Sequence, residues 1–190
     1  PLPNQTVPES LGLPVLLLVE DSMTSMAIIA RDLREHYSLV HARDGQEAWQ
    51  ILQAEPAIEL VITDIQMPRI SGQQLLKLIR TSDDPHIRAL PVIVMTTADG
   101  NDQKHLAFLN GANDFLSKPV DPIELQARVN VHHRLSSTIR ELEANRKALA
   151  EQATTDSLTG LRNRRSFYEH ANHELVVGRQ HGADMSVVPL

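Results

Sequence analysis

Pro14-Val15-Leu16-Leu17-Leu18-Val19 runs directly into Glu20-Asp21, and the same kind of apolar run recurs further along the chain. The later runs and the polar residues that end them are Leu60-Val61-Ile62-Thr63 before Asp64, Pro91-Val92-Ile93-Val94-Met95 before Thr96, and Asn113-Asp114-Phe115-Leu116-Ser117 before Lys118-Pro119. Apolar runs of this length, separated by amphipathic stretches, predict buried strands of a parallel sheet. The carboxyl ends of such strands share one edge of the sheet, where ligands bind. We therefore expect these polar residues to meet in space.

The residues at this edge predict a phosphoryl-transfer pocket. Crowded carboxylates repel each other, by about 4 kcal/mol per pair at ~4 Å and an effective dielectric of ~20. A hard divalent cation relieves that repulsion, and Mg²⁺ suits a site with one or two carboxylates and phosphate oxygens. A carboxylate can also attack phosphorus to form an aspartyl phosphate. A lysine and a hydroxyl would then stabilise the phosphoryl oxygens.

The rest of the chain alternates strands with helices. The stretch 22–36 places Met26, Ile29, Ala30 and Leu33 on one helical face, 38–42 is a short strand, and further helices begin at Asp44-Gly45 and at Gly72. The only tryptophan, Trp49, belongs to an apolar stripe and is expected to pack, and the acids of 82–85 are expected in a solvated turn. This pattern predicts an α/β fold with a doubly wound, five-stranded parallel sheet in the flavodoxin-like order 2-1-3-4-5 and an extended C-terminal helix.

Residues 13–134 resemble the receiver domain of bacterial two-component response regulators. The motifs that carry the resemblance are Glu20-Asp21, then Asp64, Met67, Pro68 and Gly72 in the pattern D-x-x-M-P-x-x-x-G, the hydroxyl of Thr96, the segment Gly111-Ala112-Asn113-Asp114-Phe115, and Lys118-Pro119. Each motif alone is weak, but together and in this order they are specific. Glu20 stands where many relatives have Asp, which keeps the charge on a longer arm.

The resemblance implies a role for each residue of the pocket. Asp64 would be the phosphoacceptor, and Mg²⁺ would be held by Asp21, Asp64 and the backbone carbonyl of Gln66, with Glu20 assisting through water. Thr96 and Lys118 would bind the phosphoryl group, and Thr96 and Phe115 would form the switch. The donor would be a sensor histidine kinase or a phosphotransfer protein. We also expect a cis Lys118–Pro119 peptide, because Lys118 must turn towards Asp64 at the end of its strand.

A long helix is predicted after the last strand. Asp121-Pro122-Ile123-Glu124 combines an N-cap, a proline at the first helical position and a capping-box glutamate, and neither Pro nor Gly recurs before Gly160. Leu135, Ile139, Leu142 and Leu149 fall on an a/d seam that Arg146 interrupts, so residues 135–155 are expected to form a parallel coiled coil and a homodimer. A single helix held by i,i+4 charge pairs is the alternative.

A second resemblance begins at Thr155. Thr155-Asp156-Ser157-Leu158-Thr159-Gly160-Leu161-Arg162-Asn163-Arg164-Arg165 resembles the segment that opens GGDEF diguanylate cyclase domains. Residues 156–190 lack that family's metal-binding Asp and Gly-Gly signature, and so short a segment does not bury a core of its own. We therefore expect a piece of a longer regulator whose parent is a diguanylate cyclase, and no cyclase activity in this chain.

Composition narrows the class of protein. The net charge of −6 argues against nucleic-acid binding, no apolar run has the length of a membrane span, and no cysteine is present. Residues 1–12 are expected to be a flexible leader and the protein to be cytoplasmic. The histidines at 132, 133, 170 and 173 are expected to be exposed helix residues rather than metal ligands. Two other functions stay open, namely a phosphohydrolase with an aspartyl-phosphate intermediate and a dimerisation module that is never phosphorylated. The first is disfavoured because Gln66 stands where those enzymes carry a second Asp.

Overall fold

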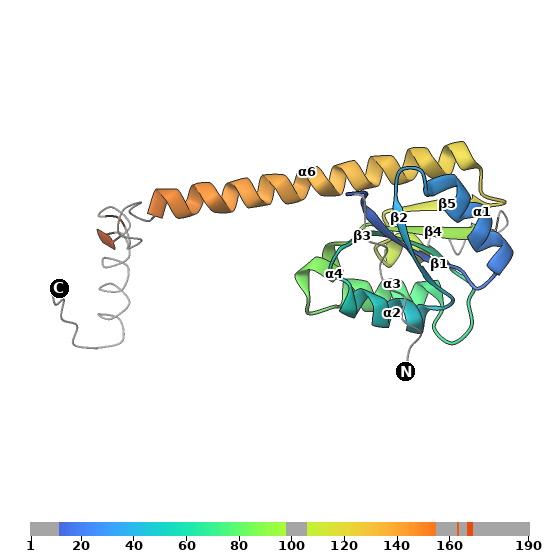
Figure 1. The fold of residues 1–190 in the computed structure, drawn as a ribbon. Coiled ribbons are helices and arrows are strands. Elements are labelled where there is room, and N and C mark those ends of the chain that lie inside the picture. Colours follow the sequence, from blue (N-terminus) through green and yellow to red (C-terminus); the bar gives the residue numbers. More distant parts are fainter. Residues whose placement is uncertain (1–11, 98–105, 155–162, 164–166, 169–190) are drawn as a thin grey trace, which may run out of the picture. The chain divides into compact units, whose positions relative to one another are not determined.

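The computed structural model describes residues 12–97, 106–154, 163 and 167–168 (Figure 1). The strands are β1 (Val15–Val19), β2 (Ser38–Ala42), β3 (Ile58–Asp64), β4 (Val92–Thr97) and β5 (Asp114–Lys118). The helices are α1 (Met23–Leu33), α2 (Gly45–Ala54), α3 (Gly72–Arg80), α4 (Pro85–Ala89) and α6 (Pro122–Thr154), and residues 106–109 are also helical. The chain divides into two compact units, residues 1–137 and 138–190.

All five strands form one parallel sheet in the order β2-β1-β3-β4-β5. The order changes direction at β1, because the chain places β2 on one side of β1 and then crosses to β3 on the other. Loops that leave β1 and β3 in opposite directions open a crevice at the carboxyl ends of these two strands. The predicted fold class, strand order and long C-terminal helix are confirmed.

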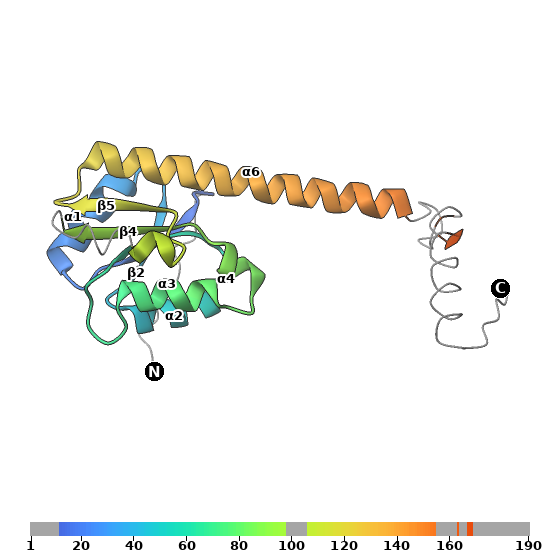
Figure 2. The ribbon, with the colours of Figure 1, turned by 180° about the vertical axis from the view of Figure 1, so that it is seen from behind.

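Helices cover both faces of the sheet (Figures 1 and 2). Leu16 and Leu18 of β1 belong to the core that packs against α1 and the first turns of α6, whereas Leu17 and Val19 belong to the core that packs against α2 and α3. Successive residues of a strand point to opposite faces, so a strand buried on both sides is apolar throughout. This is why the apolar runs lack the alternation of a half-exposed strand.

Side-chain caps fix where the helices begin. Ser22, Asp44 and Ser71 accept hydrogen bonds from backbone N–H groups of the first turns of α1, α2 and α3, and Ser71 forms a capping box with Gln74. The solvated turn expected at 82–85 is only partly correct. Asp84 caps the short helix α4, which has Pro85 at its first position. An Asp followed by Pro is a typical start of a helix. The five residues of α4 are nevertheless too few to show helical periodicity.

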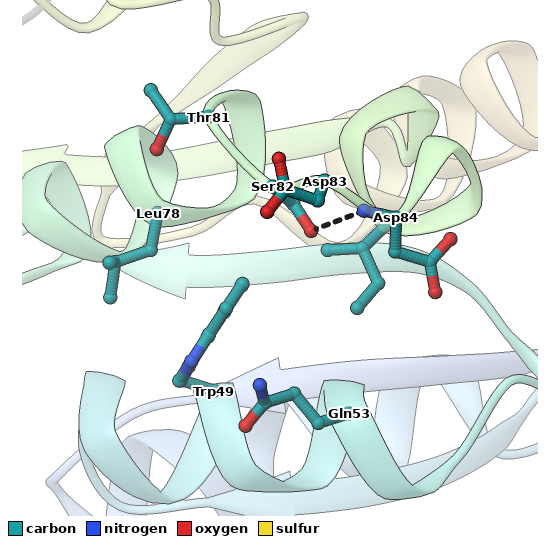
Figure 3. Close-up of a pocket in the computed structure, with 8 residues that line it drawn as sticks. Trp49, Gln53, Leu78, Thr81, Ser82, Asp83 and Asp84 are labelled. Carbon is teal, nitrogen blue, oxygen red and sulfur yellow. Dashed lines mark hydrogen bonds between the residues drawn. The ribbon is translucent and has the colours of Figure 1, made fainter.

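Trp49 is half-buried against the core, as its place in an apolar stripe predicted. It lines a cleft of about 450 Å³ between α2 and the turn that joins α3 to α4 (Figure 3). Gln53, Leu78 and Asp83 also line this cleft, and none of the predicted pocket residues does. The cleft is therefore separate from the carboxyl edge of the sheet.

Helix α6 runs without a break for 33 residues. The carboxylate of Asp121 accepts a hydrogen bond of 2.8 Å from the N–H of Glu124, which caps the start of the helix. Leu125 and Val129 are fully buried against the sheet. No helix in the described part of the chain combines the length and the apolar character that a bilayer span requires.

Candidate functional site

The register of the sheet brings the predicted residues to one level. Val19 pairs with Thr63, so Glu20 and Asp64, the residues that follow them, lie side by side. Asp64 pairs with Met95, and Thr96, one residue beyond, pairs with Ser117. Lys118 is then the next residue of β5. Glu20, Asp64 and Lys118 therefore stand at or one step past the end of a strand, and Thr96 is one residue before the end of β4.

Three carboxylates gather at this edge. Glu20, Asp21 and Asp64 each offer an oxygen atom, and these atoms lie within 4.8 Å of one another. Glu20 is 1% exposed and Asp64 is 8% exposed, whereas Asp21 is open to solvent. Two nearly buried carboxylates at such a distance need positive charge beside them.

Lys118 supplies that charge. Its ammonium nitrogen lies 2.6 Å from Oδ2 of Asp64 and 2.7 Å from Oε2 of Glu20. Burial by itself lowers the pKa of Lys118, but the hydrogen bonds and charges of Asp64 and Glu20 outweigh burial, so this pKa lies above its ordinary value. The peptide bond between Lys118 and Pro119 is cis, as expected from the sequence.

The loop after β3 is held tightly to Asp64. The N–H of Gln66 donates to Oδ1 of Asp64 at 3.3 Å, and the N–H of Gly72 donates to the carbonyl of Ile65 at 3.0 Å. A Cβ atom at position 72 would overlap the carbonyl oxygen of Asp64, so only glycine allows this close return of the chain. The loop thus carries the backbone of Gln66 past the acidic edge.

A second set of contacts fixes the far side of this loop, and sequence reasoning missed it. Arg69 has a φ of 61°, and its guanidinium forms an ion pair with the fully buried carboxylate of Asp44. The N–H of Gly45 also donates to the carbonyl of Ile70 at 3.0 Å. These contacts join the loop after Asp64 to the start of α2. The cap at Asp44 was visible in the sequence, but nothing in the sequence indicated its partner.

Thr96 and Phe115 occupy the neighbouring strands β4 and β5. Thr96 is 2% exposed, and its hydroxyl lies 3.5 Å from the carbonyl oxygen of Thr97. Phe115 is half-buried and pairs with Val94 in the sheet. Its ring meets that of Phe108 edge to face, with centroids 5.5 Å apart. The two residues predicted to form a switch therefore lie on adjacent strands.

Beside Phe115 lies a polar network that the sequence analysis did not predict. Nη1 of Arg128 lies 2.7 Å from both carboxylate oxygens of Asp114, and Nε2 of His132 lies 3.0 Å from Oδ2 of that group. Burial alone raises the pKa of Asp114, but hydrogen bonds from Arg128, His132 and the N–H of Phe115 outweigh it, so the pKa lies below its ordinary value. The same network holds the pKa of Arg128 above its usual range.

The expected exposure of the two neighbouring histidines is wrong. The side chains of His132 and His133 are only 15% and 17% exposed, and each faces a carboxylate, Asp114 and Glu59 respectively. Burial follows from their position on the face of α6 that turns towards the sheet and Tyr37. The prediction that they hold no metal is not contradicted, since the one candidate metal cluster in the described ranges is that of Glu20, Asp21 and Asp64.

The acidic edge fits a magnesium ion in its chemistry. Its donors are carboxylate oxygens, which Mg²⁺ prefers, and one face is open through Asp21 to water, which Mg²⁺ retains. Lys118 already places one positive charge against two of these groups. The residues present therefore match the cation that the sequence predicted.

Comparison with known proteins places this geometry in a family. Residues 16–130 match the model of the response regulator receiver domain. The chain belongs to the response regulator receiver family. All predicted pocket residues, from Glu20 to Lys118, lie within the matched range.

One related response regulator extends beyond the region that matches this chain. The chain is 33% identical to the response regulator GtcR of Aneurinibacillus migulanus over 141 residues, which cover 74% of this chain and 55% of GtcR. The chain thus spans about half the length of this relative.

Two solved structures add context for the receiver. One is the receiver domain of Ssk1 bound to the phosphotransfer protein Ypd1 from Saccharomyces cerevisiae, with a TM-score of 0.57, 29% identity and coverage of 65% of this chain and 90% of that one. The other is a "probable two-component system response regulator/GGDEF domain protein", with a TM-score of 0.60, 32% identity and coverage of 65% of this chain and 50% of that one.

The predictions for the dimer seam, the two ends of the chain and the Gln66 carbonyl remain untested. Leu135, Ile139, Leu142 and Leu149 are all exposed on α6, and the partner that they were predicted to meet stays a prediction. Residues 1–11 and most of 155–190, which include the GGDEF-like motif except Asn163, lie outside the described residues. The position of the Gln66 carbonyl relative to a metal also stays a prediction.

Proposed function

We propose that this receiver is a phosphorylation-dependent switch in which Asp64 accepts a phosphoryl group from a histidine kinase or a phosphotransfer protein. The observation that carries the proposal is the contact of Lys118 with both Asp64 and Glu20 at the edge where three carboxylates converge. Family membership supports the same reading. The Ypd1 complex supports the class of partner, because the receiver in it binds a phosphotransfer protein.

The chemistry requires a nucleophile that is ionised and positioned. The carboxylate of Asp64 is held from two sides, by the N–H of Gln66 and by Lys118. An oxygen of Asp64 forms a bond to phosphorus while the bond from phosphorus to the donor imidazole nitrogen breaks, and the electron pair of that bond leaves with the imidazole. Because little covalent chemistry is left to the protein, positioning and charge neutralisation carry the catalysis.

The other residues of the edge neutralise charge. Bound Mg²⁺ would be held by Asp21, Asp64 and the backbone carbonyl of Gln66, with Glu20 reaching it through water, and it would supply electrostatic stabilisation of the phosphoryl oxygens. Lys118 remains beside the acyl phosphate as a fixed cation, and Thr96 donates its hydroxyl to a phosphoryl oxygen.

The phosphoryl group adds roughly one negative charge at the edge of the sheet. We infer that Thr96 and Lys118 follow that charge and that Phe115 moves inward into the space that Thr96 leaves. This movement biases the surface formed by residues 106–109, the β4–β5 edge and α6 between two states. The Phe108–Phe115 contact lies at this surface, so such a movement would change it.

The output that we propose is a diguanylate cyclase controlled through dimer geometry. The sequence from Thr155 to Arg165 resembles the opening of a GGDEF domain, and one solved relative is named as a response regulator with a GGDEF domain. Helix α6 is continuous from Pro122 to Thr154 and directly precedes that segment in the sequence. Its exposed apolar residues support a homodimer in which two output domains meet.

Intact-protein mass spectrometry tests the phosphoacceptor. Incubation with acetyl phosphate and Mg²⁺ is expected to add one phosphoryl group per chain, and Asp64→Asn is expected to abolish the addition. Asp83→Asn, which removes an exposed carboxylate remote from the edge, is the matched control and keeps it. Stoichiometric phosphorylation of Asp64→Asn would contradict the assignment. A wild-type protein that takes up no phosphoryl group would favour the dimerisation module that is never phosphorylated.

A further inference from the structure

Arg128 belongs to α6, and its guanidinium lies beside the ring of Phe115, the aromatic residue of the proposed switch. Its Nη1 contacts both oxygens of Asp114 on β5 at 2.7 Å. Its Nε and Nη2 contact Oε1 of Glu124, one turn earlier on α6, at 2.8 and 2.6 Å. Its central carbon lies 5.8 Å from the centroid of the Phe115 ring.

The guanidinium makes contacts both in its own plane and on its face. All of its in-plane contacts go to carboxylates, one on β5 and one on α6, which ties the first turns of the helix to the strand. The face of the plane is thereby left for an aromatic ring, because a planar cation that donates at its edges can still stack. A lysine ammonium cannot fill both roles, since it lacks the planar fork.

Phe115 is therefore held from two sides. The ring meets Phe108 edge to face and Arg128 as a cation over the ring. Both contacts belong to the position that the ring has now, and an inward movement of the ring ends the contact with Arg128. Arg128 forms its ion pair with Asp114, the residue next to Phe115 in the sequence. The ring and the ion pair are therefore linked through one segment of β5.

We propose that Arg128 is a positioning residue for Phe115, which holds the ring in its present position and passes its movement to the start of α6. The proposal rests on the switch function proposed above. It adds a named connection between the switch and the output helix. When the ring moves inward, the guanidinium loses its aromatic neighbour, and its ion pair with Asp114 can rearrange.

A linkage argument gives the sign of the effect. A ligand that needs the ring inward binds more weakly while another contact holds the ring outward. Removal of that contact therefore raises the affinity for the ligand. An exposed cation–aromatic contact is worth about a twofold to fivefold change in such an equilibrium. A residue that only supports the fold would leave the affinity unchanged or lower it.

The experiment measures the affinity for beryllofluoride, a stable mimic of the phosphoryl group, in the presence of Mg²⁺ by calorimetry. Arg128→Met keeps the length of the stem and removes the charge, and it is expected to bind beryllofluoride about twofold to fivefold more tightly. Arg128→Lys is expected to fall between Met and the wild type. Lys147→Met, which removes an exposed cation from the same helix, is the matched control and should leave the affinity unchanged.

A double-mutant cycle shows whether Arg128 acts through the ring. Phe115→Leu removes the aromatic face, and in that background Arg128→Met is expected to have no further effect on the affinity. An unchanged or weakened affinity in Arg128→Met, or an equal gain with and without the ring, would overturn the proposal. If Arg128→Met does not fold, Arg128→Lys is measured in the same cycle with the same expected direction.

The outcomes separate this inference from the function on which it rests. If the wild-type protein does not bind beryllofluoride with Mg²⁺, the proposed phosphoacceptor site fails, whatever Arg128 does. If the wild type binds it and Arg128→Met binds it equally well, the site stands and the role of Arg128 fails.

Discussion

At the scale of single residues, Lys118 keeps the acidic edge together. Its ammonium contacts Asp64 and Glu20 at once, and Glu20 is almost completely buried. A buried carboxylate that loses its cation is costly, because its charge has neither water nor a partner. The same lysine that would bind the phosphoryl group thus also stabilises the fold before any ligand binds.

Replacing this lysine gives a prediction that depends on magnesium. Lys118→Met is expected to lower the free energy of unfolding by about 3 kcal/mol without Mg²⁺, because Glu20 and Asp64 then repel each other unscreened. Bound Mg²⁺ supplies the missing charge, so added Mg²⁺ is expected to stabilise the variant more than the wild type. Urea denaturation with and without Mg²⁺ measures both quantities. An equal gain from Mg²⁺ in the two proteins would show that Lys118 and the metal site are independent.

The residues that the sequence predicted well stand at strand ends. Asp64 and Lys118 are 54 positions apart, yet each follows an apolar run, and the rule that parallel strands end at one edge brings them together. The partners that were missed follow no such rule. The ion pairs of Arg69 with Asp44 and of Arg128 with Asp114 depend on how a loop and a helix pack on the sheet, which no local pattern specifies.

At the scale of elements, the contact between β5 and α6 decides how the long helix is held. Among the α6 residues whose burial is described, Leu125 and Val129 are fully buried, and the polar network around Asp114 adds further contacts between the helix and β5. The sequence predicted the start of α6 from its cap and its length from the absence of Pro and Gly. It could not predict the attachment, since a histidine or arginine on a helix is usually solvated.

This network predicts that the free energy of unfolding depends on pH. The pKa of Asp114 is lowered in the folded protein, so its contribution to stability is present above the ordinary aspartate pKa and is lost as the pH falls through the lowered value. The difference in unfolding free energy between the wild type and Asp114→Asn is therefore expected to be largest near neutral pH and to shrink below about pH 4.

Urea denaturation at a series of pH values from neutral to acid checks this prediction. Asp83→Asn serves as control, because Asp83 is exposed in the turn before α4. A difference between wild type and Asp114→Asn that stays constant down to acid pH would show that the charge of Asp114 is not what holds α6.

At the scale of the whole molecule, the proposed signal requires two chains. Leu135, Ile139, Leu142 and Leu149 are between 47% and 65% exposed, at spacings that form one seam along a helix. Such a seam is stable in water when a second helix covers it. Two copies of α6 in parallel would bring two output domains together, which is what a change of dimer geometry needs.

The oligomeric state tests this assembly. Ile139→Glu combined with Leu142→Glu places two charges in the seam and is expected to convert a dimer into a monomer. Ala144→Glu, at an exposed position on the opposite side of the same helix, is the control and should remain a dimer. Light scattering of the three proteins measures the mass. A wild-type monomer, or a dimer that survives the double substitution, would contradict the seam and favour the single charged helix.

The central claim is that Asp64 carries the phosphoryl group, and its most direct test locates the modified residue. Borohydride reduces an acyl phosphate to a primary alcohol, so after treatment with acetyl phosphate and Mg²⁺ a phosphorylated aspartate is recovered as homoserine. Peptide mass spectrometry is expected to find homoserine at position 64 in the wild type and nowhere in a sample without the phosphodonor. Homoserine at another aspartate, or none in a protein that has bound Mg²⁺, would contradict the account.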